Sequence, residues 1–146
     1  MINTKEPILG FQGDYRWLSN FAPVSIMYDG VVYPSVENAY VAAKTTDIAS
    51  RVQLETCSPA TAKSIGKMLA LRSHWEQLKV PLMYRFLCQK YDSDPYKTLL
   101  IGTVGQYIEE TNTWNDRFWG VCNGKGKNVL GLLIMSIRDD IIADVN

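Results

Sequence analysis

The sequence predicts an α+β fold, a compact single domain that is mostly helical with a small antiparallel sheet. Two observations carry this prediction. Residues 24–28 and 31–33 flank Asp29-Gly30, the turn that two-residue β-hairpin loops favour. Typical helix starts recur along the rest of the chain, at Ser35, Ser58-Pro59 and Asp94-Pro95. The length suits one domain over residues 1–146, because no repeat, low-complexity run or linker interrupts the chain.

These signals also set the bounds of the expected elements. Ser35 is the expected N-cap of the first helix, and proline at the first helical position opens the helix after Ser58. Pro81 begins a further helix. The last helix is apolar on most sides until Arg138, so we expect it at the centre of the fold. The expected helices span residues 36–45, 48–56, 59–71, 82–91, 96–101 and 128–142, and a strand spans residues 106–110.

The charge of the chain argues against one class of function. Its fifteen basic and fifteen acidic side chains cancel. A protein that coats nucleic acid non-specifically needs a strong positive field, which this chain lacks. Recognition of one modified base or nucleotide stays open.

The cysteines and the single histidine predict neither disulfides nor a metal site. Cys57, Cys88 and Cys122 lie far apart, no C-x-x-C pair occurs, and His74 alone cannot anchor zinc. We therefore expect free thiols in a reducing compartment. The first residues lack the apolar core of a signal peptide, and no apolar run is long enough for a membrane span. The expected location is the cytoplasm, without a membrane partner.

A glycine- and lysine-rich loop before the last helix is the most informative stretch. Residues 115–120 supply an acid and two aromatic rings, and residues 124–128 supply two glycines and two lysines. Gly124 and Gly126 can adopt positive φ angles and let a ligand approach the backbone closely. Free N–H groups at the following helix start would favour an anion. The alternative is a loop that only turns the chain into its last helix.

Glu37 and Lys44 lie seven residues apart in the first expected helix. Seven residues are nearly two turns, so both side chains project from one face, about 10 Å apart along the axis. Tyr40 and Val41 lie between them, and the face carries a carboxylate, a phenol and an amine, spaced like groups that flank a ligand. The alternative is support of the helix alone, since the macrodipole favours an acid in the first turn and a lysine in the last.

Two further residues could contact a base. The amide of Asn20 suits a base or ribose edge, or it is a turn asparagine that bonds its own backbone. Trp75 follows an expected helix end and either stacks on a base or belongs to the core. His74 has no evident acid–base partner, so we expect it at the surface. No Ser–His–acid order, Walker loop or Rossmann glycine fingerprint occurs.

Several short segments occur together in an order and spacing found in one known family. They are Leu18-Ser19-Asn20-Phe21, Tyr33-Pro34-Ser35-Val36-Glu37, Lys44, Trp75-Glu76, Asn115-Asp116, Trp119-Gly120, Gly126-Lys127-Asn128-Val129-Leu130-Gly131 and Met135. With them the chain resembles the NADAR family over almost its whole length. Two positions depart from that family's pattern: Asn38 stands where histidine is usual, and Val41 stands where glutamine is usual.

The resemblance implies a NADAR-like domain that hydrolyses an N-glycosidic bond between a ribose and a base. It also implies two substrate groups: ADP-ribose on guanine, and phosphorylated early intermediates of riboflavin synthesis. The expected partners are ADP-ribose or a phosphoribosyl-type small molecule, and ADP-ribosylated DNA or RNA, with no cofactor. The implied catalytic residues are Glu37, Lys44 and Asp116. The implied substrate-binding residues are Ser19, Asn20, Phe21, Tyr40, Trp75, Trp119, Gly120, Gly126, Lys127 and Asn128.

The chemistry of the implied catalytic residues agrees with this activity. Cleavage develops positive charge at the anomeric carbon, which a nearby carboxylate stabilises. Glu37 and Asp116 could form the carboxyl pair that glycoside hydrolysis uses. Lys44 could hold a phosphate as a cation. It could instead attack the opened ribose to form a Schiff base, which requires its pKa to fall toward about 7–8. The covalent role ranks slightly ahead.

Three classes of function therefore stay open on the sequence. The first is an N-glycosidase, the second a module that binds ADP-ribose or a nucleotide without hydrolysing it, and the third a structural domain. Turnover of ADP-ribosyl-guanine separates the first class from the second. Affinity for ADP-ribose separates the second from the third.

Overall fold

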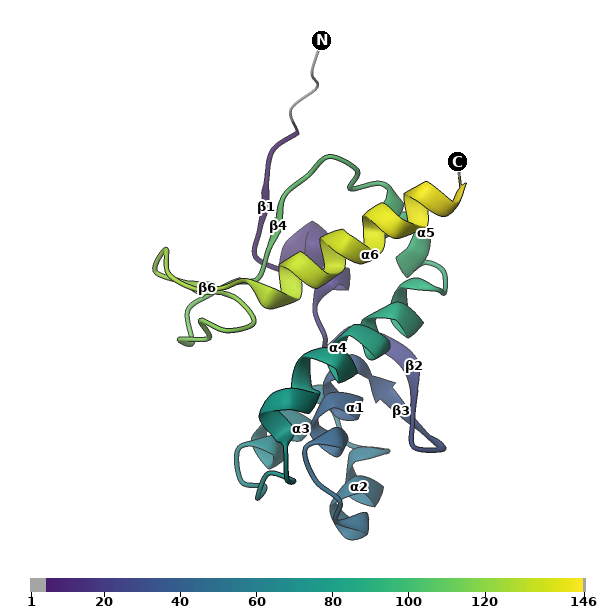
Figure 1. Ribbon diagram of the computed structural model, residues 1–146, viewed down its shortest axis with the longest axis vertical. Helices are drawn as coiled ribbons and strands as arrows, with labels where there is room; N and C mark the ends of the chain where they lie inside the picture. The colour runs from purple at the N-terminus through teal and green to yellow at the C-terminus, as the bar shows by residue number, and fades with distance from the viewer. Residues whose placement is uncertain (1–4, 146) are drawn as a thin grey trace. The chain divides into compact units, whose positions relative to one another are not determined.

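The chain folds into two compact units in the computed structural model, which describes residues 5–145 (Figure 1). Unit 2 is continuous, Asn20–Asp92, and unit 1 combines the described residues up to Ser19 with those from Ser93 onward. The single-domain assignment stays a prediction. Among the described residues, none of the helices has the length and apolar character that crossing a membrane requires.

Unit 2 begins with the expected β-hairpin. Strands β2 (Pro23–Tyr28) and β3 (Val31–Ser35) are antiparallel, with Tyr28 opposite Val31. Asp29 and Gly30 have φ angles of 52° and 78°, the two positive values that a type I′ turn requires. The hairpin and its small antiparallel sheet are therefore confirmed.

Four helices complete unit 2, and three of them start at a side-chain cap. Ser35, Asp47 and Ser58 each accept a hydrogen bond from the backbone N–H three residues later, as N-cap residues do. The helices are α1 (Val36–Ala43), α2 (Ile48–Leu54), α3 (Pro59–Gly66) and α4 (Trp75–Tyr91) (Figure 1). The predicted starts of α1, α2 and α3 are confirmed, but α3 ends at Gly66 rather than at residue 71.

The predicted start of α4 at Pro81 is wrong. The helix begins at Trp75, after His74 in a left-handed conformation with φ 63°, and Pro81 lies inside it. Proline removes one helical hydrogen bond, and the exposed position of Pro81 leaves the packing face of α4 intact. Packing of that face overrides the local stop signal.

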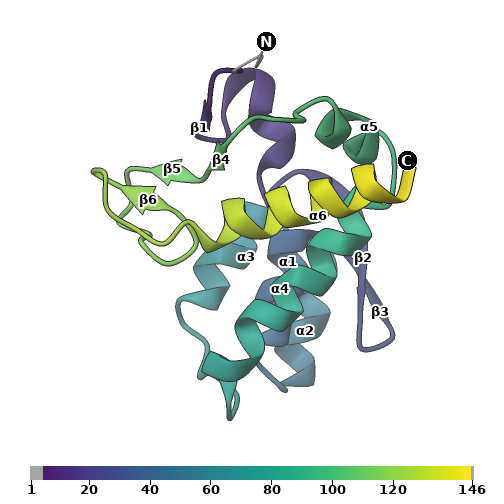
Figure 2. The ribbon, with the colours of Figure 1, turned by 45° about the horizontal axis from the view of Figure 1, so that its top comes forward.

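Within its described residues, unit 1 contains two helices, a 3₁₀ helix and four very short strands. These are β1 (Ile8–Leu9), η1 (Gly13–Leu18), α5 (Tyr96–Ile101), β4 (Ile108–Glu109), β5 (Thr111–Asn112), β6 (Val121–Cys122) and α6 (Val129–Val145) (Figure 2). Strands β1 and β4 pair in parallel, as do β5 and β6. The expected helices at residues 96–101 and 128–142 and the strand at 106–110 are present, with a shorter strand.

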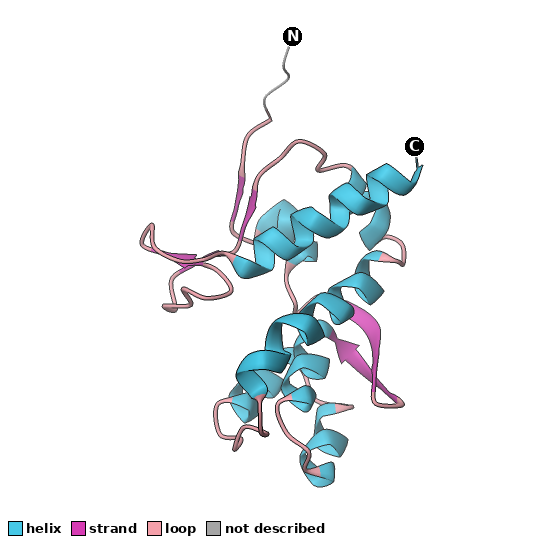
Figure 3. Ribbon diagram, viewed as in Figure 1, coloured by secondary structure: helices cyan, strands magenta, loops and turns pink. Residues whose placement is uncertain are grey.

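Helix α6 is amphipathic rather than central. It buries Leu130, Ile134 and Ile137, while Leu132 keeps 54% of its surface exposed. Arg138 is also buried, and its guanidinium donates to the carbonyl oxygens of Thr103 and Gln106. The buried guanidinium is satisfied by backbone acceptors, as burial of a charge requires. Helices predominate over strands throughout the chain (Figure 3), which confirms the α+β class.

Candidate active site

The Lys44 amine is the centre of the candidate site in unit 2. Lys44 is the C-cap residue of α1, and its Nζ lies 5.2 Å from the centre of the Tyr40 ring. Gly66 of α3 lies beside the same Nζ. Burial lowers the pKa of Lys44, the Glu37 carboxylate raises it in part, and the Lys79 ammonium lowers it further. A lowered pKa is the direction that a nucleophilic amine requires.

Glu37 lies in the first turn of α1, beside Asn20. Its backbone N–H donates to the Asn20 carbonyl over 3.0 Å. The Asn20 amide donates to Sδ of Met83 at 3.7 Å, while Asn20 Oδ1 is buried and accepts no hydrogen bond from the described residues. A buried acceptor without a partner is costly, and a ligand hydroxyl or amine could satisfy it.

Tyr40 and Trp75 join α1 to α4. Their ring centroids lie 5.3 Å apart with an interplanar angle of 57°, and only 5% of Trp75 is exposed. Trp75 begins α4 rather than following a helix end. Its packing against Tyr40 supports the core assignment, so it forms a wall of the site. Exposed His74 agrees with the surface assignment.

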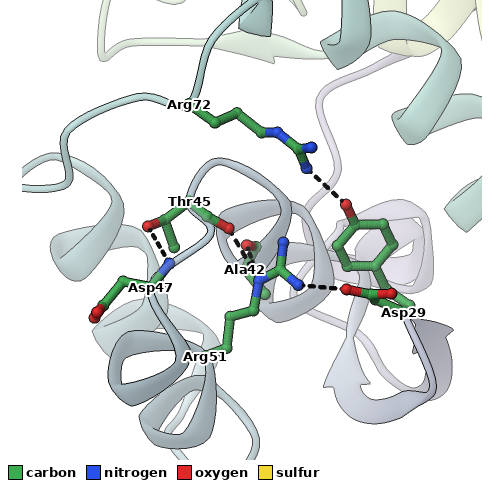
Figure 4. A network of polar contacts seen from close by, with 7 residues as sticks. Asp29, Ala42, Thr45, Asp47, Arg51 and Arg72 are labelled. Carbon is green, nitrogen blue, oxygen red and sulfur yellow. Dashed lines mark hydrogen bonds and ion pairs between the residues drawn. The ribbon is translucent and has the colours of Figure 1, made fainter.

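Two arginines that the sequence did not single out fix the end of α1 (Figure 4). Nε of Arg51 donates to the carbonyls of Ala42 and Thr45, at 3.1 and 2.9 Å, and its Nη1 pairs with Asp29 at 2.8 Å. The Arg72 backbone N–H donates to the Lys44 carbonyl at 2.8 Å, and its guanidinium donates to the Tyr28 hydroxyl. These bonds hold Lys44 in position through its backbone.

The structure thus brings together five residues that the sequence predicted for the site. They are Asn20, Glu37, Tyr40, Lys44 and Trp75. Phe21 follows Asn20 and is half-buried. Lys79 of α4 also acts electrostatically on Lys44. The sequence did not predict this residue, because helix packing rather than a short motif relates it to Lys44.

The two departures from the family pattern lie in the core of unit 2. The Asn38 amide donates to the carbonyls of Leu54 and Cys57, each at 2.9 Å, and the residue is fully buried. Val41 is buried against Gly66. Both side chains therefore connect α1 to the segments packed against it.

In unit 1, Asp116 organises a turn. Its Oδ1 accepts hydrogen bonds from the backbone N–H groups of Phe118 at 3.1 Å and Trp119 at 2.9 Å. The Asn112 side chain bonds both the carbonyl and the N–H of Asp116. The rings of Phe118 and Trp119 meet edge to face, with centroids 4.9 Å apart. The catalytic role of Asp116 and the stacking role of Trp119 stay predictions.

The expectation of free N–H groups before α6 is wrong. The N–H of Val129 donates to the Phe118 carbonyl at 3.1 Å, and that of Leu130 to the Trp119 carbonyl at 3.0 Å. The N–H of Asn128 donates to the carbonyl of Gly120. The loop of residues 115–120 therefore occupies the donors that would have bound an anion.

The glycines of this region allow close chain packing. Gly124 and Gly126 have the expected positive φ angles, 73° and 152°. A Cβ on Gly126 would lie 2.2 Å from the Gly120 carbonyl oxygen, and one on Gly120 would lie 2.1 Å from that of Glu110. The loop thus turns the chain tightly into α6, and a role of Gly120 and Gly126 in substrate binding stays a prediction.

The other predicted residues of unit 1 have local roles. The Asn128 amide bonds the Ile108 carbonyl and the Glu110 N–H, at 2.9 and 3.0 Å. Lys127 is exposed, with its Nζ 5.8 Å from the Phe118 ring centre, and the Ser19 N–H closes η1 on the Arg16 carbonyl. Their contribution to substrate binding stays a prediction.

A half-buried lysine with a lowered pKa near a glutamate, on a mostly helical α+β fold, is an arrangement typical of enzyme sites. Comparison with known proteins supplies the family. The NADAR domain model matches residues 10–142, and the chain belongs to this family. The relatives include proteins named N-glycosidase, so the function is that of a glycosidase family.

The similarity extends over most of the chain. N-glycosidase YbiA of Shigella boydii serotype 4 is 35% identical over 133 residues, which covers 88% of this chain and 82% of that protein. The NMR structure of YbiA from E. coli matches with a TM-score of 0.83 and 31% identity, over 97% of this chain and 89% of that one. The riboflavin biosynthesis protein PYRR of Zea mays is 33% identical over 87% of this chain, but over only 23% of its own length.

Proposed function

We propose that the chain hydrolyses an N-glycosidic bond between a ribose and a base, with Lys44 as the covalent nucleophile. The observation that carries this proposal is the Lys44 amine, which is desolvated beside the Tyr40 ring and faces Glu37 along α1. Desolvation favours the neutral amine, the form that can attack a carbon atom. A lysine that only supported the helix would gain more from an exposed, charged position.

The proposed reaction has two stages. In the first, Lys44 Nζ bonds to the anomeric carbon, the bond from that carbon to the base nitrogen breaks, and the base leaves with one of the two Nζ protons. The bond to the ring oxygen then opens, a proton passes from Nζ to that oxygen, and a Schiff base forms. In the second, water hydrolyses the Schiff base, which frees the amine and releases the ribose as its aldehyde.

The neighbours of Lys44 have matching roles. The Glu37 carboxylate stabilises the positive charge that develops at the anomeric carbon. The Tyr40 ring, packed on Trp75, covers one side of the amine. The buried Asn20 Oδ1 is an acceptor for a ribose hydroxyl or a base amine. Asp116 is the proposed second carboxylate.

Removal of ADP-ribose from guanine, in a nucleic acid or a nucleotide, is the first proposed substrate reaction. Cleavage of phosphorylated intermediates of riboflavin synthesis is the second. The second is favoured by the names of two relatives: the Zea mays protein above, and a riboflavin biosynthesis protein of Vibrio vulnificus, 28% identical over 94% of this chain and 39% of its own length. A binding module without turnover is the alternative.

Parallel incubation with an ADP-ribosylated guanine oligonucleotide and with riboflavin intermediates tests the activity and the substrate. Mass spectrometry should show release of the base from one substrate class. Binding of ADP-ribose without base release from either class would instead support the binding module.

Borohydride trapping tests the role of Lys44. Reduction during turnover should leave the sugar covalently attached to Lys44, identified by peptide mass spectrometry. Lys44→Arg keeps the charge but stays protonated at working pH, so turnover should be abolished while ligand affinity is mostly retained. An active Lys44→Arg variant without an adduct would contradict the covalent step and assign Lys44 to phosphate binding, for which arginine is well suited.

A further inference from the structure

Lys79 of α4 is a cation that acts on the Lys44 amine from another helix. It lies one helical turn after Trp75 on α4, and Trp75 packs on the same Tyr40 ring that Lys44 Nζ contacts. Only 16% of the Lys79 side chain is exposed, and its Nζ lies 2.8 Å from Oε2 of Glu76, whose side chain is 73% exposed. The ammonium of Lys79 is therefore turned inward, and the carboxylate of Glu76 reaches it from the solvent side.

The direction of the two helices places Lys79 beside the middle of α1. The Arg72 N–H bonds the carbonyl at the end of α1, so the chain just before α4 lies at that end. At the other end of α1, Asn20 bonds both the Glu37 N–H and, on α4, Met83. The helices are therefore antiparallel, and Lys79 lies along α4 between these two connections.

The charges that face Lys44 come from two elements. Among the described residues, Glu37 of α1 attracts the protonated amine and Lys79 of α4 repels it. From α3, the residue in contact with Nζ is Gly66, which has no charge. The guanidinium groups of Arg51 and Arg72 are directed to Asp29 and to the Tyr28 hydroxyl.

Glu37 has two opposing effects on catalysis by Lys44, and Lys79 counteracts the unfavourable one. The carboxylate that stabilises the transition state also favours the protonated, inactive form of Lys44. A second cation nearby opposes this effect, because like charges disfavour protonation. We infer that Lys79 is a positioning residue of the site, whose charge beside the middle of α1 favours the neutral, nucleophilic form of Lys44. This inference rests on the proposed function.

Competitive labelling of Lys44 tests the inference without substrate. The protein is treated with trace acetic anhydride across a pH series, and acetylation of Lys44 is quantified by peptide mass spectrometry. Lys79→Met should raise the pKa of Lys44, so that Lys44 is acetylated less at a given pH below its plateau. Lys79→Arg should restore the wild-type value, because arginine keeps the charge. Should Lys79→Met fail to fold, Lys79→Gln replaces it.

Glu76→Gln is the matched control. It breaks the Lys79–Glu76 ion pair but leaves the Lys79 charge, so the pKa of Lys44 should stay unchanged or fall. If Glu76→Gln instead raised the pKa as Lys79→Met does, the ion pair rather than the charge would matter, and the inference would be overturned.

Turnover separates this inference from the proposed function. The acid limb of the kcat/KM profile of Lys79→Met should move to higher pH, with kcat recovered at alkaline pH. A raised KM with an unmoved profile would assign Lys79 to substrate phosphate binding and overturn the inference. Failure to trap a sugar on Lys44 in the wild type would contradict the covalent mechanism, whatever the labelling shows.

Discussion

An acidic side chain at position 37 is favoured both by the helix macrodipole and by the proposed chemistry. An acid in the first turn of α1 stabilises the helix by about 0.3–1 kcal/mol, and the same carboxylate acts on Lys44. Sequence alone could not separate these roles, because both place an acid at the start of a helix. The structure adds that the Glu37 N–H is fixed by the Asn20 carbonyl, which restricts where the carboxylate can reach.

We expect Glu37→Gln to lower the rate about a hundredfold or more, in line with loss of one electrostatic stabiliser. The shape of the side chain is kept and only its favourable interaction with the helix dipole is lost, so the melting temperature should fall by no more than a few degrees. Single-turnover base release and thermal unfolding measure the two effects. Asp116→Asn should act similarly, since asparagine keeps an acceptor for the Phe118–Trp119 turn. Glu55→Gln, on α2, is the control, and a fully active Glu37→Gln enzyme would reduce Glu37 to a helix-start residue.

Lys90 is a second lysine with a perturbed pKa, and its burial has a consequence for stability. The side chain is fully buried, and burial lowers its pKa to about 7. Between that value and the ordinary 10.5 of an unfolded lysine, the unfolded chain holds a proton that the folded chain has released. Stability therefore increases with pH across this range.

Lys90→Met should remove this pH dependence. From pH 7 to pH 9, the wild-type melting temperature should gain from the Lys90 contribution, which amounts to at most about 1.4 kcal/mol per pH unit. The Lys90→Met variant should show a smaller increase over the same range, and Lys67→Met, at an exposed position, should follow the wild type. Parallel curves for wild type and Lys90→Met would show that Lys90 is protonated in the folded chain.

At the scale of the element, the loop before α6 shows how one sequence pattern can serve two purposes. Glycines with positive φ angles beside a helix start are found at anion sites. Here the same glycines let two chain segments approach, and the segment of residues 115–120 takes the helix-start N–H groups. Local sequence cannot distinguish the two cases, because the bonding partner comes from elsewhere in the chain.

A pair of glycine variants tests this packing role. Gly126→Ala should destabilise the protein by about 3 kcal/mol or more, since the φ angle is 152° and the new Cβ would meet the Gly120 carbonyl at 2.2 Å. Gly124→Ala should cost only about 1 kcal/mol, because nothing lies within 4 Å of its Cβ. Urea unfolding measures both values. If both variants had equal and small effects, the packing role would be contradicted, and the loop would again be a candidate ligand-binding site.

Elements defined by local chemistry were predictable, and elements defined by packing were not. The Asp29-Gly30 turn and the caps of α1 and α3 act within a few residues, and each appears where the sequence places it. The start of α4 fails because six residues before Pro81 are helical through packing. Of the two-residue strands of unit 1, β4 falls within the predicted strand at residues 106–110, whereas β1, β5 and β6 are too short to leave a periodic pattern.

At the scale of the whole molecule, the candidate site also combines residues that local sequence predicts with residues that only packing identifies. The spacing of Glu37 and Lys44 follows from helix geometry and was readable from the sequence. Lys79, Arg51 and Arg72 come from other helices and loops, and only the fold shows that they act on α1. The arrangement of the candidate site therefore depends on residues that a motif search around Glu37 and Lys44 does not find.

The overall charge leads to a last prediction, on nucleic-acid substrates. Fifteen basic and fifteen acidic side chains leave no net charge, so the chain has no strong positive field to attract a phosphate backbone. If the substrate is ADP-ribose on a guanine in DNA or RNA, affinity should come from the modified nucleotide. The slope of log affinity against log salt should be no steeper than about −2, the value for two or so phosphate contacts.

Fluorescence anisotropy with three ligands measures this: an ADP-ribosylated oligonucleotide, the same oligonucleotide unmodified, and ADP-ribose. The modified oligonucleotide and ADP-ribose should bind with similar affinity, and lengthening the oligonucleotide should add little. The unmodified oligonucleotide should bind weakly at physiological salt. A slope of about −6 or steeper, or tight binding of unmodified strands, would show a local basic surface that the net charge conceals. Recognition would then depend on the nucleic-acid backbone as well as on the ADP-ribosyl group.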